Sequence, residues 1–504
     1  MKYKNFKMLT AIGASLLLLA GCAGKDTQEN MAETQKEPEI VGVYEAENAQ
    51  LSQNLSVNTI INGFTGEGYV EGMEADGDAC TFKVTIEEDG FYDLQFITAN
   101  IGGYKENYIL VDGVSIGTLA SETDTFSEGI MQRNYLTAGE HQVTISKYWG
   151  YVALDRLEIL KSSPLPEDYY TVSAKLCNPD ASENAKRVMS YLADNYGVNV
   201  ISGQYSDEGM YGHEMACIWA ETKKFPAMLG LDMMEYSTSR TASGSVGKSI
   251  DQALEAWEDG SLITMCWHWN VPQKYLTGTW YSGFYKEHTN IDLDKIMNGE
   301  DEEGYALLVS DMDVVAGELQ KLQQADVPIL WRPLHEASGG WFWWGNCEPE
   351  SYKKLYRLMY DKFTGEYGLN NLIWVWNGQD KNWYPGDDVV DIVGEDIYPG
   401  EKVYTSQMDK FMEVHEYADS NKMVVMSENG CLFDPDLAIR DGAMWGYFGT
   451  WGGEFVEGSS TMNIYSEQYT EADMLKKVYD HPNVITRDEL PDLKTYPIRE
   501  DAEQ

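Results

Sequence analysis

The hydrophobic pattern of the chain changes character near residue 162. Before it, short stretches alternate apolar and polar positions between turn signals such as Glu88-Asp89-Gly90, a pattern that predicts β-strands with one buried face. The clearest stretches are 81–86, 92–98, 108–111, 141–146 and 152–160. Short strands at this spacing predict that residues 42–161 form an all-β sandwich of the jelly-roll type.

After a proline-containing boundary at 162–166, helical faces alternate with short apolar runs. Ala185, Val188 and Leu192 mark one such face at a spacing of three to four residues. The apolar runs are 198–202, 227–231, 262–267, 328–334, 372–376, 389–394, 423–427 and 443–448. Eight such runs over roughly 300 residues predict that residues 162–504 form an α/β (β/α)8 TIM barrel. A doubly wound open sheet is the alternative, but no glycine-rich phosphate loop follows any run.

The N-terminus reads as an export signal. Three lysines within the first seven residues precede an apolar run at 8–20 that ends in Leu-Ala-Gly-Cys22, and the run is too short for a permanent membrane span. This ending resembles a bacterial lipobox, which implies a signal peptide at 1–21, lipid on Cys22 and a cell-surface, extracellular lipoprotein. Ordinary signal cleavage that leaves a free cysteine is the alternative. The polar segment 22–41 is expected to be a flexible tether.

The amino-acid composition limits the classes of partner and metal site that the protein can have. The net charge of −45, from 82 acidic and 37 basic residues, excludes nucleic acid, because phosphate binding needs concentrated Lys and Arg. The 33 Tyr and 15 Trp residues suit a neutral polysaccharide. Besides Cys22, six cysteines are scattered without tight spacing, so neither a disulfide framework nor a zinc site is indicated. We expect mostly buried free thiols, with one or two bridges as the alternative.

Two glutamates close apolar runs in the same manner. Glu336 follows the fourth run and Glu428 the seventh, and active residues of a TIM barrel lie at the carboxyl ends of its strands. One glutamate at a barrel mouth is often a structural acid. Two of them form a pair that can cleave an acetal, one protonating the leaving oxygen and the other capturing the anomeric carbon.

Five segments resemble glycoside hydrolase family 26. They are RPLHEASGGWFWWG at 332–345, WHWNVP at 267–272, WVWNG at 374–378, GEDIYPG at 394–400 and MSENG at 426–430. The resemblance implies a retaining endo-β-1,4-mannanase that acts on plant β-mannans, with Glu336 as acid/base and Glu428 as nucleophile. Such an enzyme would need no metal or other cofactor for catalysis. Relatives that cut mixed-linkage β-glucan or β-1,3-xylan keep the same pair, and these activities stay open.

The resemblance also implies roles around the pair. Tyr398 would hydrogen-bond Glu428, while His335 would contact either sugar hydroxyls or the nucleophile. Burial beside tryptophans would raise the pKa of Glu336. The other substrate-binding or supporting positions that we expect are Trp267, His268, Trp341, Asp396 and, as the aromatic floor of the cleavage subsite, Trp445.

The N-terminal half resembles a family 35 carbohydrate-binding module. The segments that carry the resemblance are YEAENAQL at 44–51, GFTGEGYVEGM at 63–73, YILVDG at 108–113 and YWGYVALDRLEI at 148–159. It implies structural calcium held by Glu45 and Glu47, expected at alternate positions of a first strand, and by Asp155 in the last strand. On spacing alone, these acids would be solvent-facing. Trp149 and Tyr104 are our candidates for the sugar platform.

Two alternatives to the endo-acting enzyme remain. A mannobiose-releasing exo-enzyme would need a loop that blocks one end of the cleft, and the segment 278–301 is long enough for that. A non-catalytic surface glycan-binding lipoprotein would need neither Glu336 nor Glu428. A tethered secreted glycosidase needs no partner subunit, so we expect a monomer.

Overall fold

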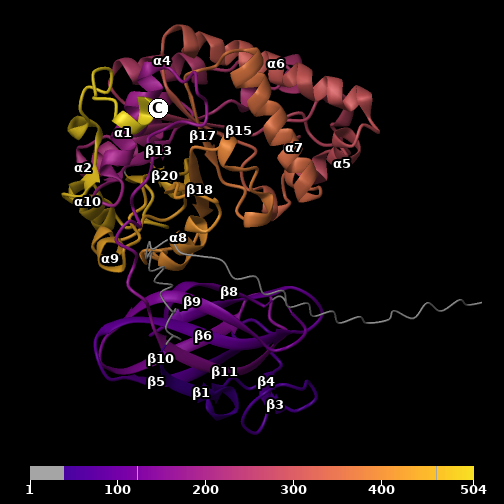
Figure 1. Cartoon of the computed structure of the whole chain (residues 1–504), viewed down its shortest axis with the longest axis vertical. Helices are drawn as coiled ribbons and strands as arrows, with labels where there is room; N and C mark the ends of the chain where they lie inside the picture. The colour runs from indigo at the N-terminus through magenta and orange to yellow at the C-terminus, as the bar shows by residue number, and fades with distance from the viewer. Residues whose placement is uncertain (1–38, 122, 461–462, 504) are drawn as a thin grey trace, which may run out of the picture. The chain divides into compact units, whose positions relative to one another are not determined.

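The chain folds into a β-sandwich followed by a parallel barrel with helices around it (Figure 1). The computed structural model describes residues 39–121, 123–460 and 463–503. The predicted signal peptide and Cys22 lie outside the described residues. The last two residues of the predicted tether do not belong to a linker, because the first strand already begins at Ile40. Among the described helices, none has both the length and the apolar character to cross a membrane.

The sandwich has two antiparallel sheets. One follows the order β3-β4-β11-β6-β9, with β1 also paired to β11, and the other follows β2-β5-β10-β7-β8. The strands are β1 Ile40–Glu45, β2 Gln50–Leu51, β3 Ser56–Asn58, β4 Tyr69–Glu71, β5 Ala79–Ile86, β6 Gly90–Asn100, β7 Lys105–Val111, β8 Val114–Ser121, β9 Ser127–Leu136, β10 Gly139–Lys147 and β11 Val152–Lys161. Apolar side chains that alternate along β5 and β10 fill the space between the sheets.

One local prediction in the sandwich is wrong. Glu45 is the last residue of β1, and Glu47 lies in the 3-10 turn Ala46–Asn48 that follows. The two carboxylates therefore do not alternate along one strand, since the chain turns between them. Asp155 does lie in β11, where the pairing register shifts between Leu154 and Arg156.

The second half of the chain is a closed barrel of eight parallel strands. They are β13 Gly203–Tyr205, β14 Met228–Asp232, β15 Leu262–Trp267, β16 Ile329–Pro333, β17 Leu372–Trp376, β18 Ile392–Ile397, β19 Met423–Asn429 and β20 Phe448–Thr450. All residues of β15, β16 and β17 are buried, as expected for strands covered on both faces. The predicted (β/α)8 barrel is confirmed.

Besides β18, which covers Ile392–Ile397 instead of 389–394, two barrel strands lie clearly later in the chain than predicted. The apolar residues Val200–Ile201 form the short strand β12, which pairs with β23 Val484–Ile485 outside the barrel. The first barrel strand is the following segment Gly203–Tyr205. The eighth strand begins only at Phe448, because the turn after α9 takes up the start of the predicted run.

Helices connect the strands and cover the outside of the barrel (Figure 1). They are α1 Glu183–Asn195, α2 His213–Thr222, α3 Thr238–Ala242, α4 Ser249–Glu258, α5 Leu293–Met297, α6 Glu302–Gln324, α7 Pro349–Tyr360, α8 Met408–His415, α9 Pro435–Asp441 and α10 Ala472–Asp480. Local signals start them: Ser182 caps α1, Asp301 caps α6, and Pro349 opens α7. A short hairpin of β21 Glu457–Ser460 and β22 Asn463–Tyr465 follows β20.

The six cysteines within the described residues are free thiols. Four of them are buried, and Cys177 and Cys347 are half-buried. The preferred prediction of unpaired thiols is therefore confirmed, and the alternative of one or two bridges is wrong.

Candidate active site

Glu336 stands in a strained turn directly after β16. Its φ is +52°, as is that of Leu334, in a region that costs a residue with a Cβ about 1–3 kcal/mol. The end of β17 holds the turn, since Glu336 N donates to Asn377 O at 2.9 Å and Ser338 N to Gly378 O at 3.0 Å. The strained backbone conformation thus places this carboxyl group at the barrel mouth.

Glu428 lies in the last part of β19 and is held by two donors. The guanidinium of Arg332 donates to its Oε1, and the hydroxyl of Tyr398 donates to its Oε2 at 2.7 Å. Arg332 is fully buried and also donates to Asp396 at 2.8 Å and to the hydroxyl of Tyr205 at 3.1 Å. The two donors therefore hold the Glu428 carboxyl group in one orientation.

Three carboxyl groups lie close together at the barrel mouth, and Arg332 contacts two of them, Asp396 and Glu428. Glu336, Asp396 and Glu428 each place an oxygen within 4.8 Å of the other two. Burial, followed by the charges of Asp396 and Glu428, raises the pKa of Glu336 well above its ordinary value. Burial also raises the pKa of Asp396, to about 7, although Arg332 opposes the shift. One cation cannot compensate three negative charges, so Glu336 is the group that keeps its proton.

Trp341 flanks the acid. Its indole nitrogen donates to Glu336 Oε2 at 2.8 Å, and the side chain is 38% exposed. This hydrogen bond lowers the pKa of Glu336 and so acts against the effect of burial. Trp343 and Trp344 are fully buried, and their indoles donate to backbone oxygens of Trp269 and His335.

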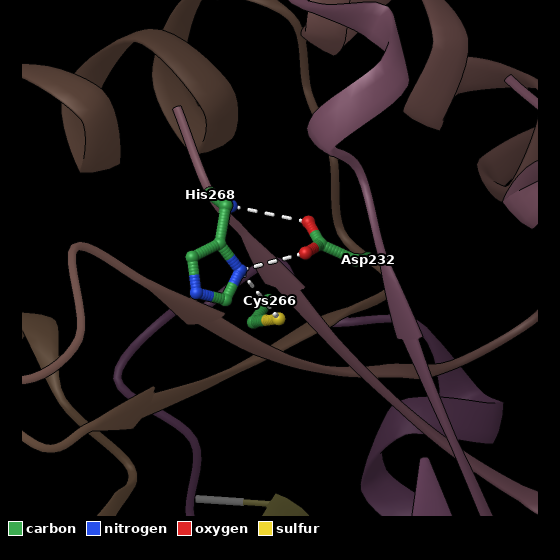
Figure 2. A group of neighbouring side chains, drawn as sticks. All are labelled: Asp232, Cys266 and His268. Carbon is green, nitrogen blue, oxygen red and sulfur yellow. Dashed lines mark hydrogen bonds and ion pairs between the residues drawn. The ribbon is translucent and has the colours of Figure 1, made fainter. Parts of the chain in front are cut away.

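His268 is fixed by a carboxylate behind it (Figure 2). Its Nδ1 donates to Asp232 Oδ2 at 2.7 Å and its backbone N to Asp232 Oδ1 at 3.1 Å. Burial alone would raise the pKa of Asp232, but the His268 ring and the backbone donors outweigh it and lower the pKa. Cys266 Sγ lies 4.0 Å from the same Nδ1. The atoms of this trio that could hold a metal are already engaged with one another.

His335 completes this chain of contacts. Its Nε2 lies 3.2 Å from Nε2 of His268, and its ring is 1% exposed. Burial, Arg332 and His268 lower the pKa of His335 well below its usual value, so it is neutral and has a single N–H. His335 therefore orients His268. Of the two contacts expected for His335, the one with Glu428 is not found among the described residues, where the donors on Glu428 are Arg332 and Tyr398. The contact with sugar hydroxyls stays a prediction.

Two predicted aromatic contacts are absent from the cleft. Trp267 is completely buried, stacks on Trp269 and donates to Ser237. Trp445 is also completely buried, because it precedes β20 and packs on Phe411 in the layer between barrel and helices. Both rings are completely buried, so neither offers a face to a sugar in the cleft.

Trp451, which the sequence patterns did not single out, takes the expected place of the aromatic floor. It directly follows β20, and its ring centroid lies 4.8 Å from that of Tyr205 and 5.7 Å from that of His268. Tyr205, Arg332 and Asp232 were likewise not in our set of expected site residues. Trp451 lies directly after the short strand β20. A sequence pattern could have identified it only if it had placed the end of this strand correctly.

A cavity of about 480 Å³ adjoins this floor. It lies at the carboxyl ends of β13, β14 and β20, and its wall carries several carboxyl groups besides aromatic and amide side chains. Its lining includes Tyr205, Asp207, Asp232, Glu235, Gln252 and Trp451. Its volume falls in the usual range for small-molecule sites.

The sandwich carries two further groups of predicted residues. Tyr104 and Trp149 are 46% and 52% exposed, and their rings meet edge to face with centroids 5.7 Å apart. Glu45, Glu47 and Asp155 do not lie on one strand.

Each of these three acids nevertheless accepts a hydrogen bond from the loop at 65–67. Thr65 Oγ1 donates to Glu45 and Thr65 N to Asp155, while Glu67 N donates to Glu47 Oε1. A Cβ on Gly66, at φ +65°, would lie 2.1 Å from that same oxygen. The other oxygen, Oε2 of Glu47, is buried without a hydrogen-bond partner among the described residues.

A TIM barrel with one glutamate just after its fourth strand and another at the end of its seventh, within reach of each other, is the arrangement of a glycoside hydrolase. The comparison with known proteins agrees: residues 177–489 match glycosyl hydrolase family 26, and residues 42–162 match carbohydrate binding module family 35. The chain belongs to glycosyl hydrolase family 26 and carries an N-terminal family 35 module.

Known proteins resemble the chain over nearly its whole length. A mannan endo-1,4-β-mannosidase of Thermothelomyces thermophilus is 35% identical over 457 residues, 89% of this chain and 90% of that protein. The crystal structure of a Podospora anserina β-(1,4)-mannanase with the same two modules superposes with a TM-score of 0.61 at 33% identity, covering 90% and 99% of the two chains. A ruminal family 26 endo-β-1,4-mannanase gives 0.62 at 27% identity with the same coverage.

Proposed function

We propose that the protein is a retaining endo-β-1,4-mannanase that hydrolyses mannan, glucomannan and galactomannan. The observation that carries the proposal is the approach of Glu336 and Glu428, which place carboxyl oxygens within 4.8 Å of each other. Retaining enzymes need their two carboxyl groups about 5–5.5 Å apart, whereas inverting enzymes leave room for a water at about 6.5–9.5 Å. The mannanases among the relatives supply the substrate class.

The first half of the reaction forms a glycosyl-enzyme. Glu336 gives its proton to the glycosidic oxygen while Glu428 attacks the anomeric carbon from the opposite face, so the C–O bond breaks as an ester bond to Glu428 forms. Arg332 and Tyr398 hold the attacking carboxylate in a single orientation. Departure of the shortened chain leaves Glu336 ionised.

The second half restores the enzyme. Glu336 now takes a proton from water, and the hydroxide oxygen attacks the anomeric carbon and releases Glu428. Two inversions give net retention. When Glu428 becomes an ester, it no longer carries a negative charge that raises the pKa of Glu336. The pKa of Glu336 then falls at the stage where Glu336 must act as a base. The same residue therefore serves as acid and then as base.

Substrate choice needs an experiment. A panel of mannan, glucomannan, galactomannan, mixed-linkage β-glucan and β-1,3-xylan is digested, and the products are sized. We expect long and mixed manno-oligosaccharides from the mannans. Mannobiose as the sole early product would favour the exo-enzyme, and preferential release from glucan or xylan would favour those relatives. Release of no reducing ends from any of them would favour a non-catalytic binding protein and overturn the proposal.

We further propose that the sandwich holds the enzyme on its polysaccharide through Tyr104 and Trp149. Exposed rings held edge to face are suited to stacking on sugar faces. Trp149→Ala should weaken the retention of the protein on insoluble mannan and leave the hydrolysis of soluble oligosaccharides unchanged. An equal loss of both would contradict a separate binding role.

Calcium in the sandwich is also proposed. The carboxyl oxygens of Glu45, Glu47 and Asp155 around one loop are hard ligands of the kind that Ca²⁺ prefers, and the unpartnered Oε2 of Glu47 supports the assignment. Bound calcium would tie the loop to the first and last strands. Chelation should lower the melting temperature of the wild type, and Ca²⁺ should restore it. A Glu47→Gln variant that responds to the chelator as strongly as the wild type would contradict the assignment.

For localisation, we propose a monomeric cell-surface lipoprotein attached through Cys22. The basic start, the apolar run and the Leu-Ala-Gly-Cys sequence support it. In a bacterial host, Cys22→Ala should release the enzyme from the membrane fraction. A wild type that is found only in the medium would show ordinary signal cleavage instead.

A further inference from the structure

Asp311 is a buried carboxyl group that the reaction described above does not use. It lies within α6, on the outside of the barrel, and is 1% exposed. Burial raises its pKa to about 6 although its hydrogen bonds oppose the shift, and no basic side chain among the described residues forms an ion pair with it. A carboxyl group buried without a cation lowers stability unless hydrogen bonds compensate. The contacts of Asp311 therefore indicate its role.

Two side chains from different connections of the barrel donate to this carboxyl group. The hydroxyl of Thr238 donates to Oδ1, and the indole of Trp269 donates to Oδ2 at 2.8 Å. Thr238 begins α3 in the segment after β14, whereas Trp269 lies just after β15. The strands β14 and β15 are neighbours in the barrel. Asp311 thus ties the segments at the carboxyl ends of two adjacent strands to one helix.

The same two segments carry Asp232 and His268. Asp232 ends β14 shortly before Thr238, and His268 directly precedes Trp269. Figure 2 shows Nδ1 of His268 directed at Asp232 Oδ2, and the two atoms are 2.7 Å apart. The segments that meet in this hydrogen bond are therefore the ones that Asp311 holds.

Further contacts fix Trp269 in place. It is completely buried and stacks on Trp267 with ring centroids 4.2 Å apart. The indole of Trp267 donates to Ser237 at 3.1 Å, which adds a second link between the segments after β14 and β15. Trp343, in the loop after β16, donates to Trp269 O at 2.6 Å. A displacement of Trp269 would therefore also disturb the loop that carries the acid.

His268 lies where a small displacement matters. Its Nε2 is 3.2 Å from Nε2 of His335, the residue directly before Glu336. Its ring centroid is 5.7 Å from that of Trp451, the aromatic floor. A misplacement of about 1 Å at such a position can cost on the order of a hundredfold in rate, even when the substitution that causes it is remote.

The shape and hydrogen-bonding capacity of Asp311 make it replaceable by asparagine but not by leucine. Leucine would leave the indole N–H of Trp269 and the hydroxyl of Thr238 buried without a partner, and the segments would have to shift to find other acceptors. The oxygen of asparagine can accept from Trp269 while its amide donates to the hydroxyl oxygen of Thr238. Both contacts are then kept.

We propose that Asp311 is a positioning residue for His268: by holding Thr238 and Trp269 together, it fixes the spacing of the ends of β14 and β15 and with it the place of the His268 ring. This rests on the proposed mannanase function, in which we expect His268 to bind the substrate. Loss of the Asp311 contacts lowers kcat more than it raises KM, because a misplaced ring weakens binding of the transition state more than binding of the substrate.

The test compares Asp311→Leu with Asp391→Leu. Asp391 is 4% exposed and also accepts two hydrogen bonds, from the backbone N of Cys177 and of Trp374, but it directly precedes β18 at the amino end of the barrel. The kcat and KM values are measured on a six-unit manno-oligosaccharide at a temperature where circular dichroism shows each variant folded. Asp311→Leu should lower kcat about tenfold to a hundredfold with little change in KM. Asp391→Leu should change neither, and Asp311→Asn should keep most of the parent's kcat.

A second measurement shows whether Asp311 acts through His268. In a His268→Ala background, Asp311→Leu should cause at most about a twofold further loss of kcat, because no ring is left to position. If Asp311→Leu does not fold, Thr238→Val takes its place in this cycle, since it removes one donor and keeps the shape of the side chain.

Three kinetic outcomes would overturn the inference. One is a folded Asp311→Leu enzyme with the parent's kcat, and another is a loss that multiplies in full with that of His268→Ala. The third is an equal loss of kcat in Asp391→Leu, which would show a general effect of destabilisation. If the wild type hydrolyses no manno-oligosaccharide, the proposed function fails instead. A crystal structure of Asp311→Leu then decides the positioning role, and an unmoved hydrogen bond between His268 and Asp232 would overturn it.

Discussion

Replacing Arg332 by methionine tests whether one guanidinium sets the charge state of the whole site. The side chain is fully buried between Glu428 and Asp396 and also meets the hydroxyl of Tyr205. Methionine preserves most of the length and apolar volume of the arginine stem and removes only the cation and its donors. The stability lost in Arg332→Met is therefore mainly electrostatic in origin.

The size of the effect follows from the geometry. At the 2.8 Å separation of the Arg332–Asp396 pair, the Coulomb energy is ~6 kcal/mol at an effective dielectric constant of about 20. Desolvation of the charges offsets part of this, and breaking a buried pair by removing one partner typically costs about 3–5 kcal/mol. We expect Arg332→Met to lose that much unfolding free energy. Arg332 opposes the raised pKa of Asp396. Without this cation the pKa of Asp396 should rise further, and the acid limb of kcat/KM should move to higher pH.

Urea unfolding and a pH profile on an aryl mannoside measure the two effects. Arg357→Met removes a surface arginine paired with Asp388 at 2.6 Å and should cost no more than about 1 kcal/mol with no change in the profile. The double variant Arg332→Met/Asp396→Asn should recover stability, because one uncompensated charge is gone. An Arg332→Met protein with the parent's stability and an unmoved acid limb would refute the reasoning.

Three further results are expected. Glu428→Ala should lose nearly all turnover, and added azide should restore part of it as an external nucleophile; substantial activity without azide would contradict the assignment. Glu336→Ala should lose far more activity on mannan than on a dinitrophenyl mannoside, whose leaving group needs no proton, and equal losses would argue against an acid. Burial raises the folded-state pKa of Glu395 to about 8 and of Asp409 to about 6. The folded state then binds more protons than the unfolded chain above about pH 4, so the melting temperature should fall as pH rises from 5 to 8, and Glu395→Gln should flatten that slope.

The barrel could be predicted because buried parallel strands are runs of apolar residues. β16 and β17 are buried at every position, so their sequences stand out without any alternation. The first strand, Gly203–Tyr205, did not stand out, since it contains a polar residue, and the apolar neighbours Val200–Ile201 drew the prediction toward themselves. Burial of polar side chains in a site is not visible in a hydrophobic pattern.

The sandwich shows the opposite difficulty. Its strands β8 and β9 were not predicted, because most of their residues are only half-buried or exposed and their alternation is weak. The strands β5 and β10, which alternate cleanly between buried and outward positions, were predicted nearly to their ends. Pattern reasoning finds a strand only when one of its faces is distinctly buried.

A shift of a few residues also explains the aromatic floor. The run at 443–448 suggested that Trp445 sits at the end of the eighth strand, but the strand begins at Phe448 and Trp445 lies before it. The ring that reaches the site is Trp451, six residues later. Tertiary hydrogen bonds decide where a short strand starts, and a sequence carries little local signal for that boundary.

The two glutamates illustrate how far sequence can go toward a mechanism. Each was found because it closes an apolar run, but their positions alone do not say which one is protonated. Burial and the neighbouring carboxyl groups raise the pKa of Glu336. Arg332 donates to Glu428 and Asp396, whereas the only hydrogen-bond donor found on the Glu336 carboxyl is Trp341 among the described residues. The proposed roles of two chemically identical side chains, acid and nucleophile, thus rest on burial and on the placement of one cation. Any change that moves Arg332 should affect both roles together. The charges of Asp396 and Glu428 raise the pKa of Glu336, and Arg332 contacts both of these carboxyl groups.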